Sequence, residues 1–207
     1  MWDQRTNWYM QFETYSFQGT MTCLAMTNAQ ACKSVLEVAC SSGHHSEIIA
    51  KAFLSPGARL VSCDFSHNFV ELMKERYQNS EFTKIPANSV HVDMRDFVSD
   101  SKLMADLPQP KGNERHVYGC MADNMRLPFA DESFDCYISN LSLMIVPDHR
   151  LQIREAYRVL QPGSWACFGV WGRPERTIQF NLVNKAMEQL GRELTPEFKS
   201  NFDIQKN

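Results

Sequence analysis

The chain has 207 residues, of which 43% are hydrophobic and 22% are charged, and its formal net charge is −3. This size and composition are those of one ordinary globular domain over residues 1–207, and they exclude a disordered or fibrous protein. Charges of both signs are spread along the chain and no apolar stretch approaches the ~20 residues that cross a bilayer, so we expect a soluble, cytoplasmic protein without a nucleic-acid surface.

The first 30 residues precede the first predicted strand and are rich in aromatic side chains. We interpret residues 1–30 as a lid or covering helix that packs on the rest of the domain. The aromatic residues are Trp2, Trp8, Tyr9, Phe12, Tyr15 and Phe17.

From Ser34 onward, short apolar runs alternate with amphipathic segments, a pattern typical of a parallel sheet covered by helices. Each run is apolar almost throughout, as burial on both faces requires. The predicted strands are Ser34 to Ala39, Arg59 to Asp64, His116 to Met121, Phe134 to Asn140 and Ser164 to Trp171. The predicted helices between them are Ser46 to Leu54, Asn68 to Tyr77 and Asp148 to Leu160.

Two regions depart from this simple alternation. Residues 79–115 are long for one connection, and we interpret them as an insertion that contains an additional local element. Residues 173–207 offer a helix from about Glu175 to Leu190 and a polar tail, without a sixth or seventh strand.

The seven cysteines include no C-x-x-C pair, and no histidine lies near them at metal-ligand spacing. We interpret them as reduced thiols and predict no metal site. Four lie inside apolar runs, where a free cysteine packs as a small hydrophobic residue. These four are Cys63, Cys120, Cys136 and Cys167.

Ligands of an open α/β sheet bind beyond the carboxyl ends of the strands, so the residues after each strand are the functional candidates. After the first strand, Glu37 precedes small residues up to Gly43, which let a ligand approach the backbone or simply form a tight turn. After the second, Asp64 can accept hydrogen bonds from a ribose or cap a helix. After the third, Asp123 can bind the exocyclic amine of an adenine, or only shape a turn.

These motifs, in this order, resemble those of class I S-adenosylmethionine-dependent methyltransferases, in particular the ubiquinone/menaquinone-biosynthesis type that acts on small molecules. The resemblance covers roughly residues 30 to 172. It is carried by Glu37 with Gly43, by Asp64, by Asp123 with Leu127-Pro128-Phe129 and Ser133-Phe134-Asp135, and by Arg158-Val159-Leu160-Gln161-Pro162-Gly163.

The resemblance implies a Rossmann-like, doubly wound, mostly parallel sheet with helices on both faces, and S-adenosylmethionine as the cofactor. It implies that the loop after the first strand holds the methionine part, that Asp64 holds the ribose, and that Asp123 and Asn124 meet the adenine. By the same analogy, Trp8 and Tyr15 would close over the sulfonium. The cofactor-binding residues expected on this basis are Glu37, Ala39, Cys40, Ser41, Gly43, Asp64, Phe65, Asp123, Asn124, Met125, Asn140, Leu141 and Tyr15.

Two features depart from the family. Its Gly-x-Gly-x-Gly loop is here Ala39-Cys40-Ser41-Ser42-Gly43, so two glycines are replaced by residues that disfavour a positive φ. Family members also continue into an antiparallel strand pair, which this sequence lacks. Either the chain is truncated relative to family members, or a protein partner or a homo-oligomer covers the edge of the sheet that the pair would cover.

Two functions therefore stay open. One is methyl transfer from S-adenosylmethionine to a small-molecule acceptor, and the other is a catalytically inactive, methyltransferase-like structural or regulatory subunit. A nicotinamide-binding oxidoreductase is disfavoured because the chain lacks G-x-G-x-x-G. We assign no catalytic residue, since the candidates for a general base, His44, His45, Asn140 and His149, carry no distinguishing pattern.

Overall fold

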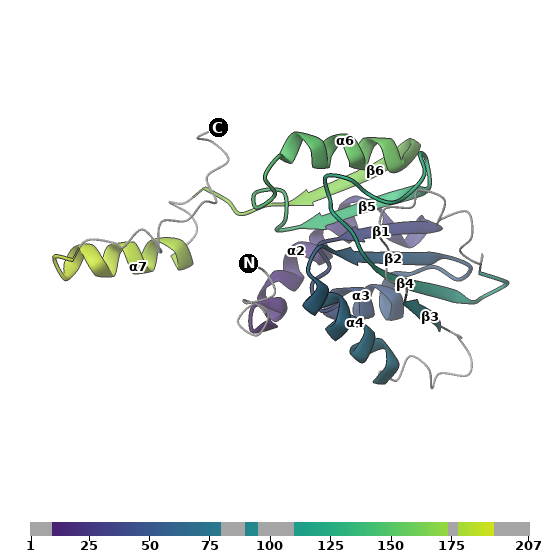
Figure 1. The fold of residues 1–207 in the computed structure, drawn as a ribbon, viewed down its shortest axis with the longest axis horizontal. Coiled ribbons are helices and arrows are strands. Elements are labelled where there is room, and N and C mark those ends of the chain that lie inside the picture. Colours follow the sequence, from purple (N-terminus) through teal and green to yellow (C-terminus); the bar gives the residue numbers. More distant parts are fainter. Residues whose placement is uncertain (1–9, 80–89, 95–109, 174–177, 193–207) are drawn as a thin grey trace. The chain divides into compact units, whose positions relative to one another are not determined.

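The computed structural model describes residues 10–79, 90–94, 110–173 and 178–192. Within them lies a six-stranded sheet in which every pair of neighbouring strands is parallel (Figure 1). Its order is β3-β4-β2-β1-β5-β6, so the chain starts near the middle and winds to both edges, and the expected α/β class is confirmed. The strands are β1 (Ser34–Val38), β2 (Arg59–Asp64), β3 (Val90–Met94), β4 (Arg115–Met121), β5 (Phe134–Asn140) and β6 (Leu160–Gly169).

The helices that connect these strands begin and end within a few residues of their predicted positions. Asp148 caps the helix before β6, because its carboxylate accepts hydrogen bonds from the backbone N–H groups of Arg150 and Leu151. The described α-helices are α2 (Glu13–Met26), α3 (His44–Ile48), α4 (His67–Asn79), α6 (His149–Val159) and α7 (Ile178–Gln189). A π-helix over Ile49–Phe53 continues α3.

The strand β3 lies inside the insertion expected between residues 79 and 115. It pairs with β4 and forms one edge of the sheet. This is an additional local element of the kind that the length of the connection predicts. The flanking segments, 80–89 and 95–109, lie outside the described residues.

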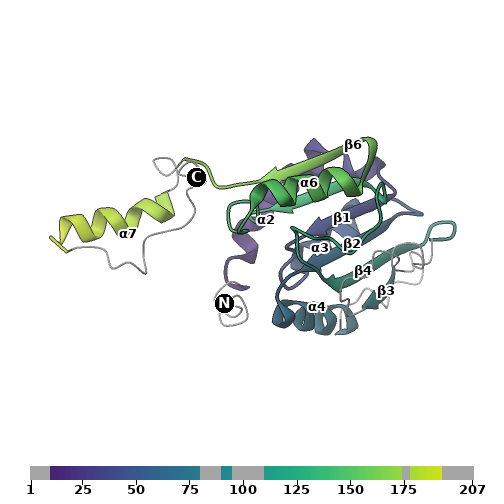
Figure 2. The same ribbon diagram turned by 45° about the horizontal axis from the view of Figure 1, so that its top comes forward.

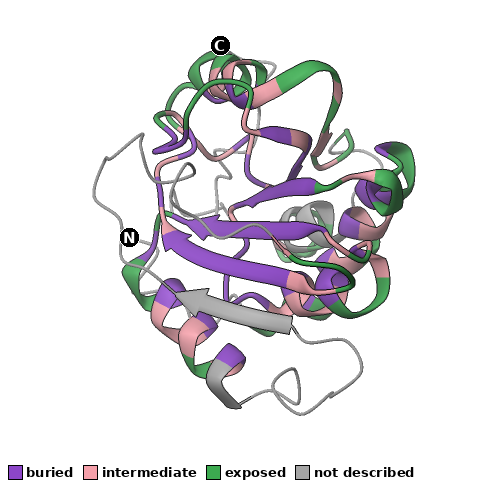
Figure 3. Cartoon of the chain, turned by 90° about the vertical axis from the view of Figure 1, so that its right-hand side faces the viewer, coloured by how far each residue is buried: buried purple, intermediate pink, exposed green. Residues whose placement is uncertain are grey.

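Alternate residues of each strand face opposite sides of the sheet and build two hydrophobic clusters. One cluster joins the strands to α2 and α4 through side chains such as Leu24 and Met73. The other joins the opposite face to α6 through Leu36 and Val159. Figures 1 and 2 show α4 and α6 on different sides of the sheet, and Figure 3 shows its central strands buried. This burial on both faces explains why the strands read as apolar runs.

Arg158 of α6 holds the Leu-Pro-Phe segment that follows β4. Its guanidinium donates hydrogen bonds to the carbonyl oxygens of Leu127 and Phe129 and to the carboxylates of Asp131 and Glu155, at 2.7 to 3.0 Å. Two motifs that lie some thirty residues apart in the sequence are therefore one structural unit.

Arg158→Met is expected to lower the free energy of unfolding by about 2 kcal/mol, because two backbone carbonyls lose a charged donor. Urea denaturation measures the change. Arg154→Met, on the exposed side of the same helix, is the matched control and should change stability by less than about 0.5 kcal/mol. Equal effects of the two substitutions would contradict this role of Arg158.

The strand β6 forms the other edge of the sheet within the described residues, and its Trp165 is 64% exposed. The chain divides into two compact units, residues 1–169 and 170–207. The first contains the sheet, and the second contains α7. The single domain expected over residues 1–207 stays a prediction.

Candidate active site

The loop after β1 keeps a backbone shape that normally requires glycine. The angle φ is 53° at Ala39, 56° at Ser41 and 74° at Gly43, which places all three residues in the left-handed region. These are the three glycine positions of the Gly-x-Gly-x-Gly pattern. A residue with a Cβ is strained in this conformation. The replacements at 39 and 41 therefore add strain to the loop.

Ala39→Gly is expected to raise the free energy of unfolding by about 1 kcal/mol, because glycine adopts a positive φ without steric strain. The greater freedom of glycine in the unfolded chain offsets part of this gain. Thermal and urea denaturation measure the difference. The matched control, Ala50→Gly, alters a buried residue of the π-helix whose φ is negative, and it should lower stability by about 1 kcal/mol. A loss of stability in both variants would show that Ala39 is not strained.

Glu37 is a buried carboxyl group inside β1, with 4% of its surface exposed. It accepts hydrogen bonds from the hydroxyl groups of Ser46 and Ser62. Burial raises the pKa of Glu37 to about 7, and the nearby carboxylates of Asp64 and Glu13 contribute to the rise. A cationic group beside Glu37 would favour its ionised form, so this position suits a positively charged ligand.

Asp64 ends β2 and connects two loops at the carboxyl edge of the sheet. Its carboxylate accepts hydrogen bonds from the backbone N–H groups of Ser41 and Ser66, each at 2.9 Å, and it is 8% exposed. The hydroxyl of Ser66 accepts from the N–H of Phe69 at 3.4 Å, so Ser66 takes the capping position considered for Asp64. Asp64 instead holds the loop after β1 in place.

Asp123 and Asn124 follow β4, which neighbours β2, so they lie at the same edge as Asp64. The carboxylate of Asp123 accepts a hydrogen bond from the N–H of Met125 at 2.9 Å and shapes a tight turn. Asn124 is 7% exposed, and its amide donates to the hydroxyl of Ser142 at 3.3 Å. The predicted turn is therefore present, and contact with an adenine stays a prediction.

The N-terminal part of α2 covers the loop after β1. The Oε1 atom of Glu13 accepts hydrogen bonds from the hydroxyl of Ser41 at 2.9 Å and from the backbone N–H of Ser42 at 3.2 Å. Arg76 of α4 donates to the carbonyl and hydroxyl oxygens of Ser42, each at 3.0 Å, and lies 3.7 Å from Oε2 of Glu13. Glu13 is 6% exposed, so its carboxylate is enclosed by these groups.

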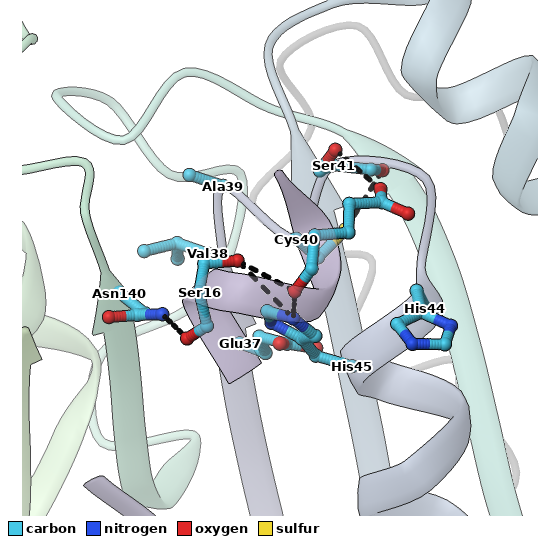
Figure 4. Close-up of a pocket in the computed structure, with 10 residues that line it drawn as sticks. Ser16, Glu37, Val38, Ala39, Cys40, Ser41, His44, His45 and Asn140 are labelled. Atoms are coloured by element: carbon cyan, nitrogen blue, oxygen red, sulfur yellow. Dashed lines mark hydrogen bonds between the residues drawn. The ribbon is translucent and has the colours of Figure 1, made fainter. Parts of the chain in front are cut away.

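His45 and Asn140 attach α2 from two sides. In His45, Nδ1 lies 2.9 Å from the hydroxyl of Thr20, and Nε2 lies 2.8 Å from the carbonyl oxygen of Glu13. Burial lowers the pKa of His45, so the ring is neutral, donates from Nε2 and accepts at Nδ1. The amide of Asn140 donates to the carbonyl oxygen of Ser16 at 2.8 Å (Figure 4). It also donates to the hydroxyl of Thr20 at 3.1 Å.

A cavity of about 20 Å³ lies between α2 and the loop, which is room for about one water. Figure 4 shows the side chains that surround it, with Asn140 directed toward Ser16 and His44 on the opposite side of the group. Five predicted cofactor-binding residues line the cavity together: Glu37, Ala39, Cys40, Ser41 and Asn140. Glu13, Ser16, His44 and His45 also line it.

Other predicted residues lie outside this cavity. Phe65 is 65% exposed and Tyr15 is 78% exposed, so neither side chain is enclosed. Leu141 has a φ of 57°, and its N–H donates to the carbonyl oxygen of Gly169 at 2.7 Å. Trp8 lies outside the described residues. Their roles toward a cofactor, like those of Gly43, Asp64 and Asp123 to Met125, stay predictions.

The sequence pattern does not reveal Glu13 and Arg76, which contact the loop from α2 and α4, or Ser16 and Thr20, which join α2 to His45 and Asn140. Hydrophobic periodicity cannot reveal them, because the contacts are hydrogen bonds between segments far apart in the chain. One usable signal is Gly19 inside α2, since a glycine inside a helix often marks a close contact. A Cβ at Gly19 would lie 2.5 Å from Oδ1 of Asn140.

Histidine, cysteine and acidic side chains do not gather into a metal-binding group anywhere in the described ranges. All seven cysteines carry free thiols; Cys63, Cys120 and Cys136 are buried as predicted, and Cys167 is partly buried. Within the same ranges, no helix combines the length and the apolar character needed to cross a membrane.

Parts of this chain are similar to known proteins. The methyltransferase domain family matches residues 96–168. A demethylmenaquinone methyltransferase of Streptomyces griseus subsp. griseus is 25% identical over 172 residues, which is 81% of this chain and 57% of that relative. Over these residues the chain is similar to class I S-adenosylmethionine-dependent methyltransferases.

Solved structures of members of this fold resemble the chain at low sequence identity. A protein of Methanococcus maripaludis, proposed to be an S-adenosyl-L-methionine-dependent methyltransferase, is 14% identical with a TM-score of 0.57, over 99% of this chain and 80% of that one. The [4+2]-cyclase SpnF is 18% identical with a TM-score of 0.51, over 73% of this chain and 44% of its own. These structures show the fold alone.

The chain covers only part of the curated relatives that it matches. It spans 57% of the Streptomyces relative and 23% to 39% of other curated relatives. The region matched by the methyltransferase domain family contains β4, β5, α6 and the contacts of Arg158.

Proposed function

We propose that this chain binds S-adenosylmethionine and transfers its methyl group to a small-molecule acceptor. The observation that carries the proposal is the conformation of the loop after β1, which has positive φ at all three glycine positions of the family pattern. The carboxylates of Glu37 and Asp64 lie beside this loop at the carboxyl edge of the sheet, where ligands of α/β folds bind.

The charges around the loop fit such a ligand. Glu13, Glu37 and Asp64 are three buried acidic residues close to one another, and Arg76 is the cation nearest to Glu13 in the described contacts. Buried carboxylates favour the binding of a cationic ligand. S-adenosylmethionine carries an ammonium group and a sulfonium, which would offset this negative charge.

S-adenosylmethionine supplies an activated methyl group, so the protein's own contribution is to align the acceptor and to exclude water. Asp64 would hold the ribose, and Glu37 would face the ammonium side of the methionine part. The helix α2 covers the loop and would shield the reacting groups from solvent. We assign no general base, because both ring nitrogens of His45 are engaged by α2.

The expected methyl acceptor is a small molecule. The family resemblance and the acidic surroundings of the loop favour a small molecule over nucleic acid. A cytoplasmic location and a protein partner or second copy along the β6 edge of the described sheet are further predictions. The second candidate function is an inactive, methyltransferase-like subunit, and the small volume of the cavity under α2 is the observation that favours it.

Calorimetric titration separates these two functions. S-adenosylmethionine and S-adenosylhomocysteine are titrated into the full chain, and we expect both to bind with dissociation constants in the micromolar range. Mass spectrometry of candidate acceptors incubated with S-adenosylmethionine then detects methyl transfer. If neither ligand binds at millimolar concentration, the enzyme function is refuted and the inactive subunit becomes the better account.

A further inference from the structure

Glu13 places a carboxylate in a site built to hold one. Its Oε1 atom accepts from the hydroxyl of Ser41 and from the backbone N–H of Ser42, and the guanidinium of Arg76 lies 3.7 Å from Oε2. We call this set of donors, Ser41 Oγ, Ser42 N–H and Arg76, the carboxylate cradle. A hydroxyl, an amide and a guanidinium are the groups that bind carboxylates in proteins.

The cradle lies at the loop that is proposed to hold the methionine part of the cofactor. That part carries a carboxylate of its own, which is chemically equivalent to the side chain of Glu13. Other protein oxygens already accept hydrogen bonds from the backbone N–H groups of Cys40, Ser41 and Gly43. Glu13 accepts the hydrogen bond from the N–H group of Ser42. Two carboxylates cannot use these donors at once.

The space left under α2 supports competition. The cavity holds about 20 Å³, whereas pockets for ligands of this size measure about 300 Å³ or more. A ligand that reaches the cradle must therefore displace Glu13. Besides Glu13 itself, hydrogen bonds from His45 and Asn140 hold the N-terminal half of α2, while Cys23 and Leu24 of its other half pack in the hydrophobic core.

We propose that Glu13 is a built-in competitor that occupies the carboxylate cradle until the carboxylate of an incoming ligand replaces it. This inference rests on the proposed function. A ligand with an amino-acid carboxylate releases Glu13 from the cradle, whereas a ligand without this group leaves Glu13 in place. The competition therefore favours ligands that carry the carboxylate. The adenosine part does not need the cradle, since Asp64 and Asp123 lie outside the cavity.

Two ligands test the competition. S-adenosylhomocysteine carries the carboxylate, and 5′-methylthioadenosine shares its adenosine and sulfur but lacks the amino-acid part. In calorimetric titrations, Glu13→Ala should tighten S-adenosylhomocysteine binding by about 10-fold and change 5′-methylthioadenosine binding by less than about 2-fold. Glu13→Asp, whose carboxylate is too short to reach the cradle, should act in the same direction and guards against a folding defect in the alanine variant.

Glu47→Ala is the matched control, because Glu47 also lies near Arg76, at 3.8 Å, but does not touch the loop donors. It should leave both affinities unchanged. If S-adenosylhomocysteine binds the Glu13 variants as tightly as the wild type or less tightly, the competition is refuted while the proposed function stands. If the Glu13 variants bind both ligands more tightly by the same factor, the competition is also refuted, because the carboxylate of the ligand would then play no part. If neither ligand binds any form of the protein, the proposed function fails and the competition with it.

Discussion

Glu37→Gln is expected to raise the free energy of unfolding by about 3 kcal/mol at pH 8 and to leave it nearly unchanged at pH 4. The pKa of Glu37 rises from an ordinary 4.5 to about 7 in the folded protein, chiefly through burial. Each pKa unit corresponds to about 1.4 kcal/mol. The folded state binds this proton more tightly than the unfolded state does. The protonated carboxyl therefore stabilises the fold fully below pH 4.5, and this stabilisation is lost as the pH rises through about 7. Glutamine has no proton to lose and escapes the penalty.

Urea denaturation of both proteins between pH 4 and pH 9 measures this difference. Comparing the two profiles cancels the titration of other groups, including His45, whose lowered pKa reduces stability on acidification. Glu47→Gln, at a more exposed acid in an ion pair with Lys51, serves as the control and should parallel the wild type. A gain from Glu37→Gln that is the same at pH 4 and pH 8 would mean that the buried charge is not its cause.

The same substitution should weaken the binding of S-adenosylhomocysteine if Glu37 faces the ammonium group of the ligand. Glu37 would then be a residue whose charge lowers stability but serves binding, as is common at functional sites. The variant thus separates the two roles, since stability and affinity should change in opposite directions.

Asp64→Ala is expected to weaken S-adenosylhomocysteine binding by about 100-fold. The substitution removes the acceptor proposed for the ribose and also frees the N–H groups of Ser41 and Ser66. An interaction between a buried carboxylate and hydroxyl donors contributes about 1.5 to 3 kcal/mol, which corresponds to roughly 10-fold to 100-fold in affinity. Asp64→Asn keeps one acceptor oxygen and should weaken binding by about 10-fold.

Asp135 provides a matched control for Asp64. Its carboxylate also accepts two backbone hydrogen bonds, from Lys33 at 2.7 Å and from Ser34 at 2.9 Å, but at the start of β1, the opposite end of the sheet. Asp135→Asn should therefore lower stability and leave the affinity unchanged. Unchanged affinity in the Asp64 variants would show that this residue only shapes the loop.

The sheet was predictable because its strands are buried on both faces, which leaves apolar runs such as Val117 to Met121 in the sequence. The first residue of β6 was harder to predict. Leu160 pairs with Phe134 ahead of the turn at Pro162 and Gly163, so the strand begins four residues before the predicted Ser164. A sequence pattern marks a proline and a glycine as a break, whereas here the chain resumes the same strand after them.

The candidate site was predictable where it follows from the order of strands and not where it depends on long-range contacts. Glu37 and Asp64 could be identified because each stands at a fixed place in its strand. Glu13 and Arg76 are separated by more than sixty residues and meet only in the folded protein. Through its polar groups, α2 contacts the loop by the carboxylate of Glu13, and it contacts His45 of α3 and Asn140 of β5 by hydroxyl and carbonyl groups. Its sequence therefore lacks the apolar periodicity that would mark its inner face.

Asn140 lies between two glycines, and this arrangement constrains how related sequences can diverge. A Cβ at Gly19 of α2 or at Gly169 of β6 would collide with its Oδ1 atom. Gly19 therefore lets α2 approach Asn140 closely, and a side chain at position 19 would require Asn140 to shift. In relatives, a larger residue at either glycine position should be accompanied by a smaller residue at position 140, so that these three positions, far apart in the chain, evolve as a single set.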